Sequence, residues 1–249
     1  MSILQVQNLS KFFGKFQVLK NVSISVDPEQ IVLLIGPNGS GKTTLINCIA
    51  GTYKPDSGTI LFNGKNVTGW QPYKLARIGL ARTFQIPAPF KKLSVLENLL
   101  AASYDHPAMN IRKALFSNFW KEYENSLINR AEKVLRLTGL YDKYDSPANE
   151  LSGGQLKLLE LARLLMLDVK LLLLDEPIGG VNPTLAYTIF ESIVKIKSEM
   201  KRSFLIIEHR LDIAMKYADY VYALAEGQII CEGLPEKVLK SEELYAIYL

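Results

Sequence analysis

Residues 31–51 read Ile-Val-Leu-Leu-Ile-Gly-Pro-Asn-Gly-Ser-Gly-Lys-Thr-Thr-Leu-Ile-Asn-Cys-Ile-Ala-Gly, and this stretch decides the fold. Its first five residues form a continuous apolar run, which is typical of a strand buried on both faces. Residues 36–43 match the pattern G-x-x-x-x-G-K-[ST] of phosphate-binding loops, and residues 44–51 are expected to form a helix. Strand, loop and helix in this order predict a phosphate site at the carboxyl end of a strand.

The loop supplies the groups that a triphosphate requires. Its glycines let backbone N–H groups wrap around phosphate oxygens, and the dipole of the following helix favours the anion. The Lys42 ammonium would neutralise the β- and γ-phosphates, while the Thr43 hydroxyl would ligate Mg²⁺. The predicted phosphate-binding residues are Gly36, Pro37, Asn38, Gly39, Ser40, Gly41, Lys42, Thr43 and Thr44.

Two adjacent acids follow a second apolar run, Leu171–Leu174. Asp175 and Glu176 would repel each other at the end of a buried strand unless a cation lay nearby. Asp175 is therefore predicted to bind the magnesium ion. Glu176 is predicted to act as the general base that polarises the attacking water.

The remaining pattern predicts an α/β fold. A third buried strand is expected at Phe204–Ile207, and helical segments between the three apolar runs predict a parallel sheet. Alternating residues at Ile3–Gln7 and Val22–Val26 predict antiparallel strands near the start. From 86 to 165 the pattern is mainly helical, with a capping box at Ser94-Val-Leu-Glu97.

We therefore predict a single domain over 1–249. Residues 1–85 and 166–249 are expected to form a phosphate-loop NTPase core with a parallel sheet and an N-terminal antiparallel β-subdomain, and 86–165 an inserted helical subdomain.

Composition excludes several classes of protein. The 249 residues are 48% apolar and 22% charged, which excludes a disordered or low-complexity chain. The net charge of +4 is too small to predict binding to nucleic acid. Neither a signal peptide nor a membrane-spanning run is visible, so the sequence predicts a soluble, cytoplasmic protein.

A second helix start carries glycines. Leu151-Ser-Gly-Gly-Gln155 precedes an amphipathic segment up to Met166, in which Ser152 reads as the N-cap. The two glycines also expose backbone N–H groups, which makes this helix start a second anion site. A chain with two such helix starts predicts a head-to-tail pair of subunits, with each nucleotide between one helix start from each subunit.

The order of these motifs resembles that of ATPase subunits of ATP-binding-cassette (ABC) transporters. The resemblance rests on the phosphate loop, Gln85, Leu151–Gln155, Asp175-Glu176 and His209, and it covers essentially the whole chain. Within the family, the chain is most similar to the subunits of branched-chain amino-acid importers. The stretches that carry this closer similarity are Ala81–Gln85, Val95–Leu100, Ile206–Asp212 and Glu232–Val238.

The resemblance implies further roles. Phe13 would stack on the adenine of ATP, with Phe12 as the competing candidate. Gln85 would contact Mg²⁺, with Thr43 and Asp175, and the attacking water. His209 would contact the γ-phosphate beside Glu176. The signature residues that would bind the γ-phosphate held by the opposite subunit are Ser152, Gly153, Gly154 and Gln155.

The function implied is an ATP-hydrolysing subunit on the inner face of a cell membrane. Its implied partners are a second ATPase subunit, identical or related, transmembrane permease subunits and, indirectly, a substrate-binding protein, with no nucleic acid. The alternatives are urea, amide or lipopolysaccharide cargo, a soluble ABC ATPase acting on DNA or ribosomes, and a small-molecule kinase.

Two features leave questions open. Asn182 stands where the family commonly has aspartate, so coupling between subunits through that residue is in doubt, although Asn182-Pro183 also reads as a helix start. Residues 104–125 carry bulky aromatics that fit either a local core or a docking face for a partner.

Overall fold

The computed structural model describes the backbone of residues 1–83, 89–103 and 118–244, and the side chains of all of these except 118–121. The chain divides into two compact units: Met1–Gln85 with Val169–Leu249, and Ile86–Asp168. The second boundary lies three residues beyond the one that the sequence suggests. Within the described residues, no helix has the length and apolar content needed to cross a membrane.

The first unit is built on a six-stranded sheet in the order β10-β9-β3-β8-β7-β6. The three strands predicted from apolar runs lie at or next to its centre, and β3 pairs in parallel with both β8 and β9. Only β10 runs antiparallel, against β9. The bounds are β3 Ile31–Ile35, β6 Leu80–Arg82, β7 Leu171–Asp175, β8 Ser203–Ile207, β9 Tyr220–Ala225 and β10 Gln228–Gly233.

A four-stranded antiparallel sheet, β2-β1-β4-β5, belongs to the same unit. Its strands are longer than the alternation predicted. Asn8 and Asn21 take left-handed backbone conformations, with φ of 50° and 53°, which interrupt the alternation while the pairing of the strands continues. The register of β1 against β2 shifts after Val6, so the inward and outward positions no longer alternate. The bounds are β1 Leu4–Phe13, β2 Phe16–Val26, β4 Ser57–Phe62 and β5 Lys65–Asn66.

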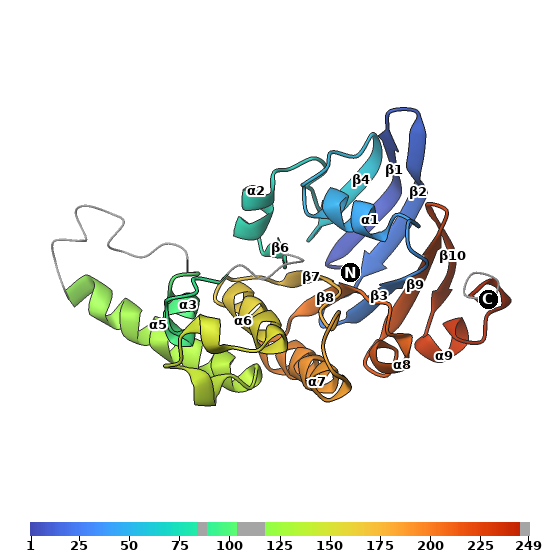
Figure 1. Ribbon diagram of the computed structural model, residues 1–249. Helices are drawn as coiled ribbons and strands as arrows, with labels where there is room; N and C mark the ends of the chain where they lie inside the picture. Colours follow the sequence, from blue (N-terminus) through green and yellow to red (C-terminus); the bar gives the residue numbers. More distant parts are fainter. Residues whose placement is uncertain (84–88, 104–117, 245–249) are drawn as a thin grey trace. The chain divides into compact units, whose positions relative to one another are not determined.

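Helices cover both faces of the six-stranded sheet (Figure 1). Helix α1, Lys42–Ile49, shares one apolar core with β1, β2 and β4 and with one face of β3, β7 and β8. Helix α7, Pro183–Met200, lies on the opposite face and buries Phe190 and Ile193. Asn182 caps α7 as predicted, because its side chain accepts a hydrogen bond from Leu185 N at 2.9 Å. The shorter helices are α2 Pro72–Arg77, α8 Leu211–Ala214 and α9 Pro235–Val238.

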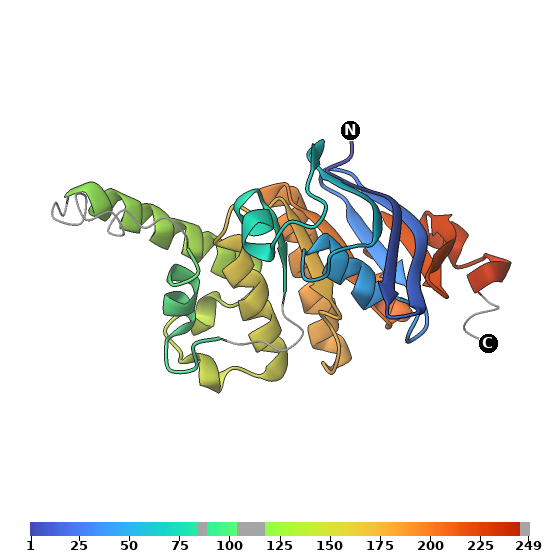
Figure 2. The same ribbon diagram turned by 90° about the horizontal axis from the view of Figure 1, so that it is seen from above.

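The second unit is helical, as the periodicity predicts. Its helices α3, Val95–Leu100, α5, Asn118–Leu137, and α6, Gly153–Leu165, lie side by side (Figure 2). Short 3-10 turns occur at Tyr141–Lys143 and Ala148–Glu150. The predicted capping box at the start of α3 is present, with Glu97 N donating to Ser94 Oγ at 3.1 Å. Most of the aromatic stretch at 104–125 lies outside the described residues.

Candidate functional site

The phosphate loop turns sharply at two glycines between β3 and α1. Gly36 has φ of 147°, and a Cβ there would lie 2.0 Å from Leu224 O. Gly41, the N-cap of α1, has φ of 107°, and its Cβ would lie 2.9 Å from Leu19 Cδ2. Both positions therefore require glycine. The helix begins at Lys42, earlier than the predicted residue 44, so that the whole GKT segment belongs to its first turn.

The start of α1 leaves backbone donors for an anion. No side chain caps this helix. In the described part of the chain, the backbone N–H groups of Gly39, Gly41, Lys42 and Thr43 make no hydrogen bond. Such N–H groups at a helix start bind phosphate oxygens well, because the helix dipole adds to the attraction. The residues present thus fit a nucleotide phosphate.

Lys42 is buried under the loop with only 5% of its surface exposed. Its Nζ donates to the carbonyls of Gly36 and Pro37, each at 2.8 Å. Burial lowers the pKa of this ammonium, while the negative charges of Glu176 and Asp175 act in the opposite direction. The two carboxylates thus help to keep a positive charge at the phosphate loop.

A single pocket brings the loop together with two candidate catalytic residues. It is lined by Val18 from β2, by Glu176 and His209, and by residues of the loop and α1. The lining residues from the loop and α1 are Asn38, Gly39, Gly41, Lys42, Thr43 and Thr44. The remaining loop residues, Gly36, Pro37 and Ser40, shape the loop without lining this pocket.

Glu176 and His209, which both line the pocket, contact each other. Glu176 Oε1 lies 3.1 Å from His209 Nε2, and both side chains are more than a third exposed. Glu176 has a left-handed backbone conformation with φ of 50°, and its N–H donates to Ile207 O at 3.0 Å. A non-glycine residue in this conformation costs free energy, and such residues concentrate at functional sites. The apolar run followed by two acids predicted Glu176 as a site residue, but it did not predict the left-handed backbone conformation of Glu176.

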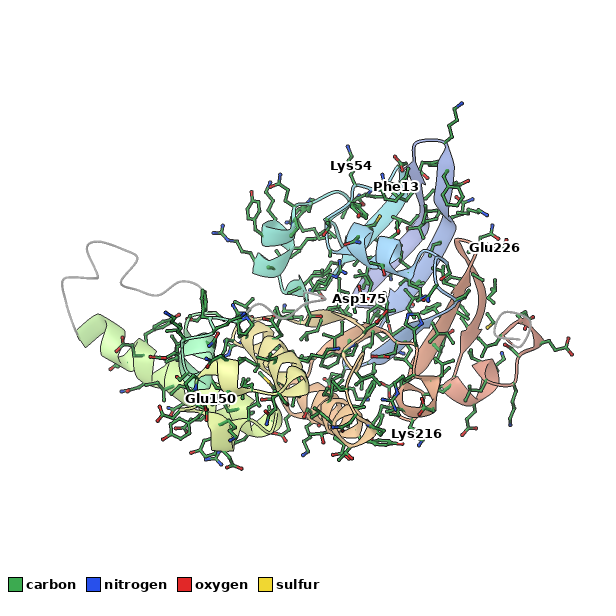
Figure 3. The ribbon with its side chains drawn as sticks, in the orientation of Figure 1. Phe13, Lys54, Glu150, Asp175, Lys216 and Glu226 are labelled. Atoms are coloured by element: carbon green, nitrogen blue, oxygen red, sulfur yellow. The ribbon has the colours of Figure 1, made fainter. Side chains whose placement is uncertain are left out.

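Asp175, labelled in Figure 3, is the last residue of β7, and its side chain is buried. Its Oδ2 accepts a hydrogen bond from Arg82 Nη2 at 2.7 Å, and Arg82 Nη1 donates to Asn47 Oδ1 on α1. No sequence pattern marks Arg82, because β6 has only three residues and the partner of Arg82, Asp175, is distant in sequence. The other carboxylate oxygen of Asp175, Oδ1, has no hydrogen-bond partner among the described residues.

The donor set near the loop suits magnesium. Among the described residues, no cluster of three or more His, Cys, Asp or Glu side chains could hold a metal on its own. Mg²⁺ is typically bound through one or two protein oxygens together with substrate phosphates and water. The Thr43 hydroxyl lines the pocket, and the Asp175 carboxylate, which does not line it, is close enough for its charge to act on Lys42. These two oxygen donors are of the kind that Mg²⁺ requires.

Phe13 lies at the end of β1 on the antiparallel sheet (Figure 3). Its side chain is 46% exposed, and its ring meets that of Tyr53 edge to face, with centroids 5.3 Å apart. The competing residue Phe12 is 42% exposed and its N–H donates to Asp56. Both rings are accessible, so stacking on adenine by Phe13 stays a prediction.

The remaining predicted site residues that the structure describes do not line the pocket of the α/β unit. Ser152 caps α6 in the helical unit, with Gln155 N donating to its Oγ at 3.3 Å and its own N–H donating to Gln155 Oε1 at 2.9 Å. Gly153 and Gly154 form the first turn of that helix. Gln85 lies outside the described residues. The predicted set therefore divides between the two units.

Comparisons with known proteins agree on one family. Residues 19–179 match the family described as ABC transporter. The chain is 47% identical over 249 residues to the "Probable branched-chain amino acid transport ATP-binding protein LivG" of Archaeoglobus fulgidus, covering 100% of this chain and 96% of that protein. It is 45% identical over 241 residues to the protein of the same name from Methanocaldococcus jannaschii, covering 97% and 93%. A crystal structure of the ADP conformation of an ATP-binding cassette matches with a TM-score of 0.85 and 41% identity, over 100% of this chain and 98% of that one.

Proposed function

Because the chain belongs to the ABC transporter family and is an ATP-binding, ATP-hydrolysing cassette, we propose that it powers branched-chain amino-acid uptake by a membrane importer. The cargo is supported by the names of the relatives that match over nearly their whole length. The site is supported by one observation above all: the phosphate loop, Glu176 and His209 line the same pocket.

The loop binds and orients the triphosphate. The unpaired N–H groups at the start of α1 donate to phosphate oxygens, and Lys42 Nζ moves from the loop carbonyls to the β- and γ-phosphates. Thr43 and Asp175, with Gln85, would hold Mg²⁺, and the ion would supply positive charge beside the phosphates. Phe13 stacks on the adenine ring.

Glu176 acts as the general base. Its carboxylate accepts the proton of the attacking water, a contribution worth about 10²- to 10⁴-fold in rate. The His209 imidazole, 3.1 Å from Glu176 Oε1, fixes the direction of that carboxylate and donates to the γ-phosphate when protonated. Arg82 holds the Asp175 carboxylate against α1, so that the metal ligand and the phosphate loop keep their spacing.

The working unit is a dimer in which a second cassette completes each site. Ser152, Gly153, Gly154 and Gln155 of the opposite subunit bind the γ-phosphate at the start of α6. Closure on two ATP molecules and reopening after hydrolysis move the permease helices to which the cassettes are attached. The chain works at the inner face of the membrane with those permease subunits and, through them, with a substrate-binding protein.

Glu176→Gln tests the site. The amide keeps the volume of the side chain but cannot take a proton, so ATP binding is retained while hydrolysis falls at least about 100-fold. Size-exclusion chromatography with ATP and Mg²⁺ then shows an accumulated dimer. Glu226→Gln is the matched control, because Glu226 is also a left-handed glutamate after a strand, with φ of 48°, but lies outside the pocket (Figure 3). Normal hydrolysis by Glu176→Gln, or monomers alone beside retained wild-type hydrolysis, contradicts the mechanism.

Uptake measurements test the cargo. Cells that carry the importer with the Glu176→Gln subunit should lose uptake of labelled leucine, isoleucine and valine while urea uptake is unchanged. Loss of urea uptake with normal leucine uptake would contradict the proposed cargo and leave the ATPase assignment in place.

A further inference from the structure

Glu208 is a buried carboxylate that the proposed mechanism does not use. It follows β8 directly and is only 1% exposed. Its Oε1 accepts a hydrogen bond from Ile178 N at 2.9 Å, and its Oε2 accepts from His209 N at 3.0 Å and from Arg210 N at 3.5 Å. One side chain thus binds three backbone N–H groups, and these belong to two different loops.

The two loops are those that carry the candidate catalytic pair. Ile178 lies two residues after Glu176, in the turn that follows β7, where Gly179 N also donates to Glu176 O at 3.0 Å. His209 lies in the loop after β8, which begins with Glu208 itself. A second link crosses in the same place, since Arg210 Nη1 donates to Val181 O at 3.3 Å. The backbones on either side of the Glu176–His209 contact are therefore joined through Glu208 and Arg210.

A carboxylate in this place is costly. Burial raises the pKa of Glu208, and the negative charge of Glu176 raises it further, while the three N–H groups act against both effects. A well-packed apolar side chain commonly stabilises a fold as much as a buried charge does or more. Packing alone therefore does not explain why this residue is a glutamate. A link between two loops does explain it, because such a link requires a long side chain with two acceptor atoms.

We propose that Glu208 is a positioning residue for ATP hydrolysis, which fixes the loop after β7 to the loop after β8 so that Glu176 and His209 stay in hydrogen-bond contact. This inference rests on the roles proposed above for Glu176 and His209. Glu208 does not line the pocket, and among the described residues its carboxylate accepts hydrogen bonds only from the backbone N–H groups of these two loops. It therefore acts through the backbone of the loops.

Glu208→Asp separates the link between the loops from the local turn. Aspartate keeps the charge and can still accept from the N–H groups of residues 209 and 210, as Asp does in many turns. Being one methylene shorter, it does not reach Ile178 N. We expect kcat for ATP hydrolysis to fall about 10- to 100-fold, because a misplacement of about 1 Å costs that much, with KM for ATP changed less than about twofold.

A double-mutant cycle with His209→Ala shows whether Glu208 acts through the catalytic pair. In the His209→Ala background the contact between Glu176 and residue 209 is already lost, so a shift of the loops cannot disturb it further. Glu208→Asp should therefore lower kcat less than about threefold in that background. Glu160→Gln is the control, since Glu160 is 6% exposed and pairs with Arg163 at 2.9 Å in the helical unit. Its effect on kcat should be small and the same with and without His209.

The outcomes are distinguishable. Wild-type kcat in Glu208→Asp, or an equal fall in both backgrounds, overturns the inference while leaving the proposed function intact. Wild-type turnover in Glu176→Gln or His209→Ala overturns the proposed function itself. If thermal unfolding shows that Glu208→Asp does not fold, Glu208→Gln carries the same cycle, because its amide keeps the length but replaces one of the two acceptors with a donor.

Discussion

Helices α1, in the α/β unit, and α6, in the helical unit, both have glycine at their start. They differ in how the backbone N–H groups of their first turn are satisfied. The N-cap of helix α1 is Gly41 in a left-handed conformation, and no side chain caps this helix. Helix α6 begins at Ser152 with a complete capping box, in which Ser152 and Gln155 satisfy each other's N–H groups. Only the first start is left with its full set of donors for a ligand.

This difference agrees with the proposed roles, in which the start of α1 holds the nucleotide and the start of α6 closes over a nucleotide held by the other subunit. An uncapped helix start in a folded core is a preformed anion site, so the proposed phosphate site at α1 requires no second subunit. The capped start of α6 is stable by itself and has a smaller donor set to offer. We therefore expect nucleotide affinity to depend on α1, and hydrolysis in the dimer to depend also on α6.

Lys42→Met should give the largest effect. The apolar side chain keeps much of the lysine volume but removes the only ammonium that lines the pocket in the described residues. We expect hydrolysis to fall about 1,000-fold, or about 4 kcal/mol, together with a clear loss of ATP affinity. Calorimetric ATP titration and a phosphate-release assay measure the two quantities. Unchanged ATP affinity would mean that the start of α1 is not the phosphate site.

Ser152→Arg should give the next largest effect, and it tests the start of α6 as Lys42→Met tests the start of α1. A bulky charged side chain at the exposed start of α6 blocks contact with a nucleotide held by another subunit, so hydrolysis should fall about 100-fold. ATP binding by the monomer should be unchanged, because α1 supplies that site. Fluorescent nucleotide titration and chromatography with ATP check both expectations.

Ser94→Arg is the matched control for that variant. Ser94 caps α3 in the same unit with the same type of box, its N–H donating to Glu97 Oε2 at 2.7 Å. Its replacement should cost stability but leave hydrolysis within about twofold of wild type. If both variants lose activity equally, the composite site formed by two subunits is wrong.

Most of the start of α1 and its phosphate loop could be predicted from the sequence, because the evidence for them is local. The phosphate loop and its flanking strand and helix lie within residues 31–51, and a fixed pattern identified them. The strained backbone of Glu176 and its contact with His209 were not predictable, since they depend on β7 and β8 being neighbours in the sheet. Arg82 was missed for the same reason: its partner Asp175 is distant in sequence.

Strand lengths in the antiparallel sheet were underestimated for a different physical reason. Left-handed Asn8 and Asn21 shift the register, and a shift of one residue turns every following side chain to the other face. The alternation that marks a strand is then interrupted, although the hydrogen-bonded pairing continues. Likewise, the backbone N–H groups that Glu208 binds could not be predicted, because Ile178 belongs to a loop that is distant in sequence.

Gly41→Ala should have a smaller effect, on stability and on the shape of the α1 start. The backbone φ is 107°, and the added Cβ would lie only 3.1 Å from Val18 O, so alanine forces either the loop or β2 to move. We expect the free energy of unfolding to fall by about 2 kcal/mol. Because Val18 lines the pocket, ATP affinity should fall as well. Thermal unfolding and nucleotide titration measure both, and a stable variant with normal affinity would show that this conformation is dispensable.

Ser152→Ala and Ser94→Ala should give the smallest effects and the sharpest contrast. Each removes one hydroxyl that accepts a hydrogen bond from the residue three positions later, at 3.3 Å and 3.1 Å, so each should destabilise its helix by about 1 kcal/mol. Their stability losses should thus be alike in chemical unfolding. Only Ser152→Ala should also slow hydrolysis, because the Ser152 hydroxyl is proposed to bind the γ-phosphate as well. Equal hydrolysis in the two variants would mean that the cap of α6 serves the helix alone.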